Sequence, residues 1–184
     1  MHILLVDLDD TIIDTVGFKK AVFQSVVEVT KLSLDEVTRL YLKSDPTQNE
    51  WYERFAAYVQ SRVPSVTSKA IVDRIFQAIQ NILVNTQVLS YIARFEGYKV
   101  LFTLGDAKIQ EAKIQELDLK TRVDEVYITQ TQKINILADH IRGHEFLWNN
   151  QTYDQVTIID NNLAFLNLVH EQYPWITAID PKSI

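Results

Sequence analysis

The stretch Ile3-Leu4-Leu5-Val6-Asp7-Leu8-Asp9-Asp10-Thr11 decides how this chain is interpreted. Its first four residues are all apolar, which is typical of a parallel strand buried on both faces, and we predict a strand over residues 3–8. Three aspartates and a threonine crowd the end of this run, so the strand leads into an acidic turn. In open α/β sheets the functional site lies at the carboxyl ends of the strands. The stretch therefore predicts a sheet with acidic chemistry at one edge.

Short apolar runs later in the chain predict further strands, and segments of helical periodicity separate them. Strands that alternate with helices indicate a parallel sheet with right-handed crossovers. We therefore predict an α/β, Rossmann-like three-layer core with a mostly parallel five-stranded sheet. Residues 143–155 fit no element clearly, although part of this segment is compatible with a helix. The four later strands are predicted at residues 99–103, 125–129, 156–160 and 175–179.

The interval between the first two predicted strands is too long for one crossover. A β-α-β unit takes about 30 residues, whereas this interval runs from Leu8 to Tyr98 and has helical periodicity almost throughout. One of its helices opens with Ser33-Leu34-Asp35-Glu36, a capping box. The simplest explanation is an inserted helical subdomain. We predict a core formed by residues 1–15 and 96–184, with a helical insertion over residues 16–95.

Composition excludes several classes of protein. The 184 residues include 24 Asp and Glu against 18 Lys and Arg, a net charge of −6 that argues against non-specific nucleic-acid binding. Cys is absent, which excludes a disulfide framework, Cys-ligated zinc and a thiol nucleophile. No apolar run approaches the ~20 residues of a membrane span, and the first residues lack the features of a signal peptide. We expect a cytoplasmic protein without nucleic-acid or membrane partners; composition leaves its oligomeric state open.

Carboxylates follow the ends of two predicted strands. Asp7 and Asp9 lie at the end of the first strand, and Asp160 ends the strand at 156–160. Carboxylates on a turn suit a hard cation such as Mg²⁺, which often shares its ligands with a substrate phosphate, and Asp160 would complete this site. Because Asp9 stands two residues beyond Asp7, the pair could divide the roles of nucleophile and general acid/base.

Phosphate-binding groups are predicted at the ends of two other strands. The hydroxyl of Thr103 could donate a hydrogen bond to a phosphate oxygen, helped by backbone N–H groups around Leu104 and Gly105. Lys133, which follows the strand at 125–129, could neutralise phosphate charge. Together with the carboxylates, these residues predict a site for a small phosphorylated substrate.

These segments resemble the motifs of the haloacid dehalogenase superfamily of phosphotransferases. Residues 4–11 are similar to its first motif, an apolar strand followed by Asp-x-Asp-x-Thr, and residues 100–105 are similar to its second. Lys133 resembles the third motif, and residues 156–160 resemble the fourth. The order and spacing agree with the family, and the helical insertion corresponds to its helical cap.

The resemblance implies a concrete mechanism. Asp7 would attack phosphorus to form an aspartyl-phosphate, while Asp9 would protonate the leaving oxygen and then activate water. Thr103 and Lys133 would hold the phosphoryl oxygens. Mg²⁺ would lie between the carboxylates of Asp7 and Asp160 and the backbone carbonyl of Asp9. The implied activity is that of a Mg²⁺-dependent phosphatase acting on a small phosphorylated metabolite.

The fourth motif departs from the family pattern, which usually has two acidic residues. Asn161 follows Asp160 and brings no negative charge, so we expect weaker Mg²⁺ binding. Two alternatives stay open: a phosphomutase that returns the phosphoryl group to a sugar, and a weakly active or non-catalytic phosphate-binding protein. A dehalogenase is the least expected, because members that do not need the acid/base often replace the residue at Asp9. Taken alone, the acidic turn is also compatible with a solvated loop, and Asp160 with a helix cap.

An aromatic group in the helical insertion has two interpretations. Trp51, Tyr52, Phe55 and Tyr58 recur at helical spacing and could line a substrate pocket. Such spacing is more typical of residues that pack a helix against its neighbours. We therefore expect these residues to form the core of the insertion.

Overall fold

The computed structural model describes residues 1–184. The chain packs as two compact units, which we call the α/β unit and the helical unit. The sequence predicts a core formed by residues 1–15 and 96–184 and an insertion over residues 16–95. This division into domains stays a prediction, because contacts define a compact unit whereas independent folding defines a domain. The α/β unit comprises Met1–Ile13, Val84–Leu104 and Leu117–Ile184, and the helical unit comprises Asp14–Leu83 and Gly105–Glu116.

The α/β unit is built on a five-stranded sheet in which every neighbouring pair of strands is parallel. The strand order is β3-β2-β1-β7-β8, so the order of the chain reverses at β1. This confirms the predicted α/β, Rossmann-like fold. The gap between β1 and β7 is the topological switch point, where open α/β sheets bind their ligands. The strands are β1 (His2–Val6), β2 (Tyr98–Leu104), β3 (Glu125–Thr129), β7 (Gln155–Ile159) and β8 (Thr177–Ile179).

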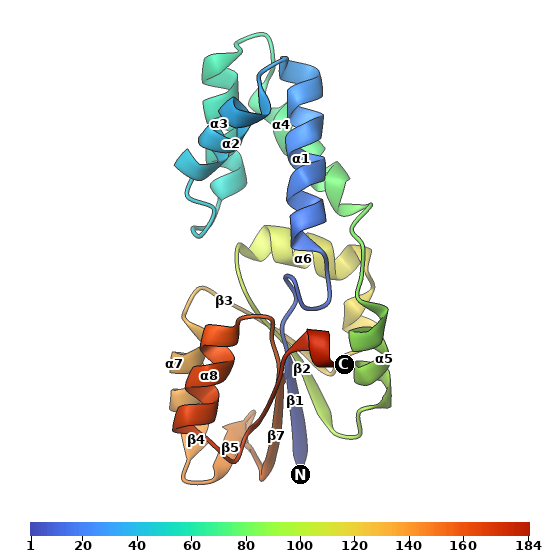
Figure 1. The fold of residues 1–184 in the computed structure, drawn as a ribbon, viewed down its shortest axis with the longest axis vertical. Helices are drawn as coiled ribbons and strands as arrows, with labels where there is room; N and C mark the ends of the chain where they lie inside the picture. Colours follow the sequence, from blue (N-terminus) through green and yellow to red (C-terminus); the bar gives the residue numbers. More distant parts are fainter. The chain divides into compact units, whose positions relative to one another are not determined.

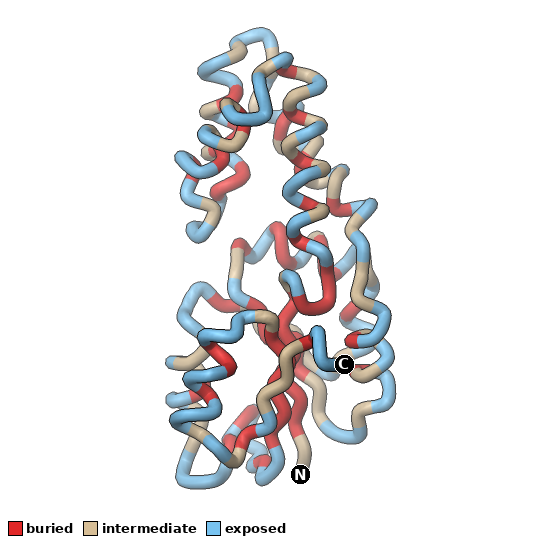
Figure 2. Tube along the Cα trace, viewed as in Figure 1, coloured by how far each residue is buried: buried red, intermediate tan, exposed pale blue.

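Helices cover both faces of this sheet, with α7 and α8 on one face and α5 on the other (Figure 1). Side chains alternate along β1, so Ile3 and Leu5 join the cluster under α7 and α8, while Leu4 and Val6 point to the opposite face. All four are buried, and much of the tube through the middle of this unit is red in Figure 2, the colour of buried residues. Burial on both faces explains why the run is apolar at every position. The helices are α5 (Thr86–Arg94), α7 (Lys133–His140) and α8 (Leu163–Gln172), with short 3₁₀ turns at Leu119–Thr121 and Pro181–Ser183.

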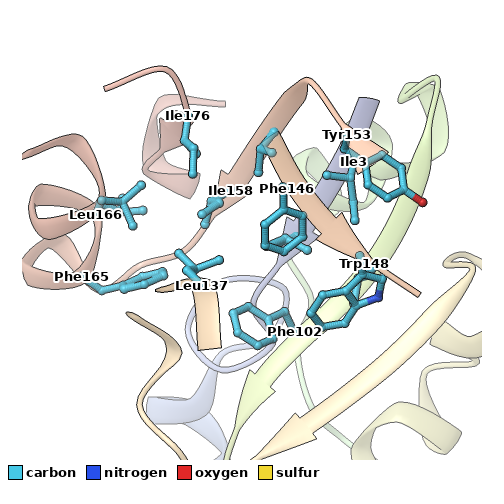
Figure 3. Packing of buried hydrophobic residues seen from close by; sticks show 14 residues of the cluster. Ile3, Phe102, Leu137, Phe146, Trp148, Tyr153, Ile158, Phe165, Leu166 and Ile176 are labelled. Carbon is cyan, nitrogen blue, oxygen red and sulfur yellow. The ribbon is translucent and has the colours of Figure 1, made fainter. Parts of the chain in front are cut away.

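Residues 143–155 form antiparallel strands and contain no helix, which differs from the helical interpretation. Asn149 and Asn150 have positive φ values of 48° and 62°, the conformation of a two-residue hairpin turn. Phe146 and Trp148 point from this hairpin into the main core (Figure 3). The segment therefore extends the core and leaves the five-stranded sheet intact. The small sheet has the order β4-β5-β6, with β4 (Ile141–Arg142), β5 (Glu145–Trp148) and β6 (Gln151–Tyr153).

The helical unit packs around an apolar cluster of its own. Ser33 and Glu36 form the predicted capping box: the Ser33 hydroxyl accepts from the Glu36 N–H, and the Glu36 carboxylate accepts from the Ser33 N–H at 3.1 Å. Trp51, Tyr52 and Phe55 are buried in the cluster, as expected for core residues. Tyr58 differs from this expectation: it is half-buried, and the ammonium of Lys43 lies 4.3 Å from its ring centroid. No helix in either unit combines the length and the apolar character needed to cross a membrane. The helices of this unit are α1 (Thr15–Thr30), α2 (Leu34–Lys43), α3 (Trp51–Arg62), α4 (Ser68–Ile79) and α6 (Ala107–Glu116).

Candidate active site

The turn after β1 is a compact loop that fixes the first aspartate. The carbonyl of Leu8 accepts hydrogen bonds from the N–H groups of Ile12 and Ile13 at 2.9 and 3.0 Å, which closes the loop within one turn. The N–H of Asp7 donates to the carbonyl of Ile159 at 2.9 Å. The backbone of Asp7 is therefore tied to the end of β7, directly at the switch point.

Three predicted site residues meet at this point. The ammonium of Lys133, the first residue of α7, lies 2.5 Å from Asp7 Oδ1 and 2.7 Å from Asp160 Oδ2. Their side chains are 10%, 9% and 3% exposed, respectively. The geometry brings one cation and two carboxylates together in a largely dry site, where charges interact more strongly than in water.

Two aromatic rings complete the surroundings of the lysine. Lys133 Nζ lies 5.6 Å from the ring centroid of Phe102 and 6.0 Å from that of Phe165. At these distances the ring faces attract a cation. Since Phe102 belongs to β2 and Phe165 to α8, the ammonium is held by residues from four elements. This arrangement orients Lys133 before any ligand arrives.

The electrostatics of Asp7 are set mainly by burial. Burial raises the pKa of the Asp7 carboxyl from its usual 3.8 to about 6, because it disfavours the charged form. Lys133 opposes this shift and lowers the pKa, whereas Asp160 and Asp9 raise it further. Asp7 is thus a desolvated carboxylate that depends on neighbouring positive charge.

A cavity of about 490 Å³ opens beside these residues. Among the predicted site residues, Asp7, Asp9, Leu104, Lys133 and Asp160 line it. Two other predicted phosphate ligands are not among the residues that line the cavity. Thr103, in β2, is fully buried, and Gly105 belongs to the helical unit.

Solved structures share this arrangement of elements at low sequence identity. A protein assigned as a haloacid dehalogenase-like hydrolase in Burkholderia xenovorans matches with a TM-score of 0.69 at 12% identity, over 96% of this chain and 80% of that one. A protein assigned as a β-phosphoglucomutase in Thermotoga maritima matches with a TM-score of 0.61 at 11% identity, over 100% and 96%. The chain has the fold of the haloacid dehalogenase superfamily. A third match, assigned as a hydrolase of this superfamily in Bacillus subtilis and bound to magnesium, has a TM-score of 0.54 at 14% identity, over 88% and 78%.

The haloacid dehalogenase fold alone does not determine the reaction. Its matches here include an L-2-haloacid dehalogenase of Xanthobacter autotrophicus as well as the hydrolases and the phosphomutase assignment. One fold hosts several chemistries, so the reaction has to be argued from the site. No family model and no curated protein sequence matches the chain.

Thr11, the last residue of the first haloacid dehalogenase-like motif, links the two acidic loops. Its hydroxyl oxygen accepts a hydrogen bond from the N–H of Asn161 at 3.0 Å and lies 3.4 Å from Asp7 Oδ2 and 3.3 Å from Asn161 Oδ1. Thr11 is 1% exposed. The sequence places Thr11 at the carboxyl end of the first strand but indicates no particular partner for it, although a hydroxyl at the end of an acidic turn commonly bonds to nearby backbone.

A Thr11→Val variant is expected to lower the free energy of unfolding by about 1–2 kcal/mol, because the N–H of Asn161 loses its buried acceptor. Urea denaturation at pH 7.5 measures the change. Thr11→Ser is the matched control, since it keeps the hydroxyl, and it should retain most of the lost stability. Equal losses in the two variants would show that the hydrogen bond contributes no more to stability than the methyl group does.

Proposed function

We propose that the protein is a Mg²⁺-dependent phosphatase that hydrolyses a small phosphorylated metabolite through an aspartyl-phosphate. The observation that carries this proposal is the convergence of Asp7, Lys133 and Asp160 at the switch point of the sheet. A desolvated carboxylate beside a fixed ammonium offers a nucleophile together with positive charge for the phosphoryl oxygens. The proposal includes no nucleic-acid or membrane partner.

In the proposed reaction, an Asp7 carboxylate oxygen forms a bond to phosphorus while the bond from phosphorus to the ester oxygen breaks. Asp9, which lines the same cavity, gives its proton to that leaving oxygen. Asp9 then takes a proton from water as the water oxygen attacks phosphorus and releases Asp7. Lys133 balances charge on the phosphoryl oxygens throughout.

The residues present fit a magnesium ion. Two buried carboxylate oxygens, from Asp7 and Asp160, lie within 2.7 Å of the same ammonium nitrogen, so they already converge on one positive charge. Carboxylate and carbonyl oxygens are the ligands that Mg²⁺ prefers. The two carboxylates and the backbone carbonyl of Asp9 would hold the ion. When bound, Mg²⁺ supplies charge stabilisation for the transferred phosphoryl group.

Hydrolysis of phenyl phosphate tests this proposal directly. We expect turnover in the presence of Mg²⁺ and its loss when EDTA removes the metal. The aspartyl-phosphate should be trapped by acid quenching with a radiolabelled substrate and lost on treatment with hydroxylamine. Turnover that persists in EDTA, or an intermediate absent at every quench time while turnover is rapid, would contradict the mechanism.

A weakly active or non-catalytic phosphate-binding protein is the second candidate, and Asn161 favours it. Asn161 follows Asp160 at the place where the family pattern has further acidic charge, and its amide faces the Thr11 hydroxyl. Tight binding of inorganic phosphate without turnover of any ester would support this candidate. The phosphomutase alternative predicts instead a strict requirement for a bisphosphate.

An Asn161→Asp variant is expected to bind Mg²⁺ about tenfold more tightly, because it adds a negative charge next to Asp160. Mg²⁺ titration of phenyl phosphate hydrolysis, or calorimetry, measures the change. Asn162→Asp is the charge-matched control: residue 162 caps α8, where Asp is well tolerated, so its effect on Mg²⁺ affinity should be much smaller. Equal effects in the two variants would indicate a general charge effect and no metal ligand at position 161.

A further inference from the structure

The α/β unit has a second cavity, of about 590 Å³, where β1 and β7 begin. Asp7 and Asp160 directly follow the other ends of these two strands. A strand rises about 3.3 Å per residue, so five residues of β1 separate the second cavity from the candidate active site by roughly 16 Å. The two cavities are therefore distinct. The second one, which we call the α5 cavity, is lined by His2, Tyr91, Arg94, Phe95, Glu96 and Gln155.

Aromatic rings form one side of the α5 cavity and are anchored to the sheet. The ring of Tyr91 stacks beside that of Phe95, with centroids 6.3 Å apart. Phe95 meets the ring of His2 edge to face at 4.4 Å, and His2 Nε2 forms a hydrogen bond with Thr157 Oγ1 at 2.9 Å. Since Thr157 is buried in β7, these contacts tie the rings to the interior of the α/β unit. Half-buried rings of this kind offer a surface to an aromatic ligand.

Gly97 keeps this aromatic wall close to the start of β1. Its φ is +149°, and a Cβ at this position would lie 2.4 Å from the carbonyl oxygen of His2 and 2.8 Å from Cε1 of Phe95. Only glycine therefore allows the chain after α5 to pass so closely. Because the backbone holds the Phe95 ring in this position, the cavity is formed before a ligand arrives.

Two side chains of opposite charge at the α5 cavity have no ionic partner within the protein. Arg94 Nε donates to the carbonyl of Ser90 at 3.2 Å, which leaves the terminal nitrogens of the guanidinium available. Glu96 lies two residues further along the chain, and its exposed carboxylate neither pairs with Arg94 nor accepts a hydrogen bond. A guanidinium binds a carboxylate through parallel charge-assisted hydrogen bonds, and a carboxylate binds an ammonium in a similar way.

We infer that the α5 cavity binds a zwitterionic aromatic amino acid, at a site separate from the proposed reaction. The ring of the ligand packs against Tyr91 and Phe95, its carboxylate pairs with Arg94, and its ammonium pairs with Glu96. One cation, one anion and an aromatic surface match the three groups of such a ligand. An aromatic molecule with a single charge would satisfy only one of the two charged side chains and would bind more weakly.

Four small molecules test this assignment by calorimetry. L-phenylalanine is the probe, whereas 3-phenylpropionate lacks the ammonium, phenethylamine lacks the carboxylate and L-alanine lacks the ring. Each of these three is expected to bind about tenfold more weakly than L-phenylalanine, because each loses one contact with the cavity. Asp7→Asn should bind L-phenylalanine with wild-type affinity, because Asp7 belongs to the other cavity.

Two variants that remove charge show which residue recognises which group of the ligand. Arg94→Gln should weaken the binding of L-phenylalanine about tenfold and abolish its advantage over phenethylamine. Glu96→Gln should abolish its advantage over 3-phenylpropionate. Arg122→Gln and Glu171→Gln, at exposed residues that do not line the α5 cavity, are the matched controls and should bind like the wild type.

Four results would overturn the assignment. The first is no binding of L-phenylalanine, L-tyrosine or L-tryptophan at millimolar concentration, and the second is equal affinity for L-phenylalanine and its singly charged analogues. The third is equal effects of the cavity variants and their controls, and the fourth is loss of binding in Asp7→Asn. None of these measurements uses phosphatase turnover, so failure of this site is distinguishable from failure of the proposed function.

Discussion

An Asp7→Asn variant is expected to lose phosphatase turnover by about four to six orders of magnitude while keeping its fold. The amide cannot attack phosphorus, and it removes one of the two carboxylates that would hold the proposed Mg²⁺. Hydrolysis of phenyl phosphate at saturating Mg²⁺ measures the loss. Asp139→Asn on the exposed side of α7 is the control and should keep wild-type turnover. Activity of the Asp7 variant within tenfold of wild type would eliminate Asp7 as the nucleophile.

The same variant is expected to be more stable than the wild type at pH 8 in EDTA. The pKa of Asp7 is about 6 in the folded protein and near 3.8 when unfolded, so folding takes up a proton between these values. Above pH 6 the buried carboxylate is charged and lowers the free energy of unfolding by about 3 kcal/mol, whereas below about pH 4 this cost disappears. Urea denaturation should thus show a gain for Asp7→Asn at pH 8 and none at pH 4. A less stable variant at pH 8 would contradict the role of burial.

Such a gain would show that the site is built at the expense of stability. Asp7 and Asp160 are held in a nearly dry position, and the ammonium of Lys133 is the cation that pairs with both. A core residue would not be arranged this way, because an apolar side chain of similar size has no desolvation cost. Catalytic groups commonly carry this kind of cost, which is why replacing them often stabilises a protein.

The sheet could be predicted from sequence because its signals are local. The runs at residues 3–6 and 156–159 are almost wholly apolar, and each belongs to a strand buried on both faces. Polar residues that end such runs must gather at one edge, because the strands are parallel. The meeting of Asp7, Lys133 and Asp160 follows from that rule without any knowledge of distances.

The hairpin at residues 145–153 could not be predicted in the same way. Its strands are four and three residues long, too short for a period to emerge. Its anchor is distant in sequence: Glu125 accepts hydrogen bonds from Trp148 Nε1 at 2.7 Å and from Asn149 Nδ2 at 2.6 Å. The one local signal was the Asn149-Asn150 pair, since asparagine tolerates the positive φ of a tight turn.

The aromatic contacts of Lys133 also could not be predicted from the spacing of residues in the sequence. A lysine at the start of a helix is recognisable, but its contacts with Phe102 and Phe165 join residues 31 and 32 positions away on two different elements. Both phenylalanines look like ordinary core residues in the sequence. Their second role arises only when β2 and α8 pack around the end of α7.

A Lys133→Met variant is expected to show the largest loss of stability at this site. Methionine keeps the length of the side chain but leaves the buried carboxylates of Asp7 and Asp160 without the cation that pairs with them. Breaking a buried ion pair in this way costs about 3 kcal/mol, which corresponds to a decrease in Tm of about 6–12 °C for a chain of this size. Thermal unfolding at pH 8 in EDTA measures the decrease. Turnover should fall about 100- to 1,000-fold, because a charge that stabilises the transition state is lost.

Two further experiments, addition of Mg²⁺ and a second substitution, distinguish this electrostatic cause of the lost stability from a packing defect. Saturating Mg²⁺ should raise the Tm of Lys133→Met more than that of the wild type, because a cation replaces the missing ammonium between the carboxylates. The double variant Lys133→Met, Asp7→Asn should recover much of the lost stability in EDTA, since one buried charge is removed. Lys182→Met, at an exposed lysine near the end of the chain, should change neither Tm nor turnover. If Mg²⁺ and the second substitution both fail to restore Lys133→Met, the ammonium is not what holds the two carboxylates together.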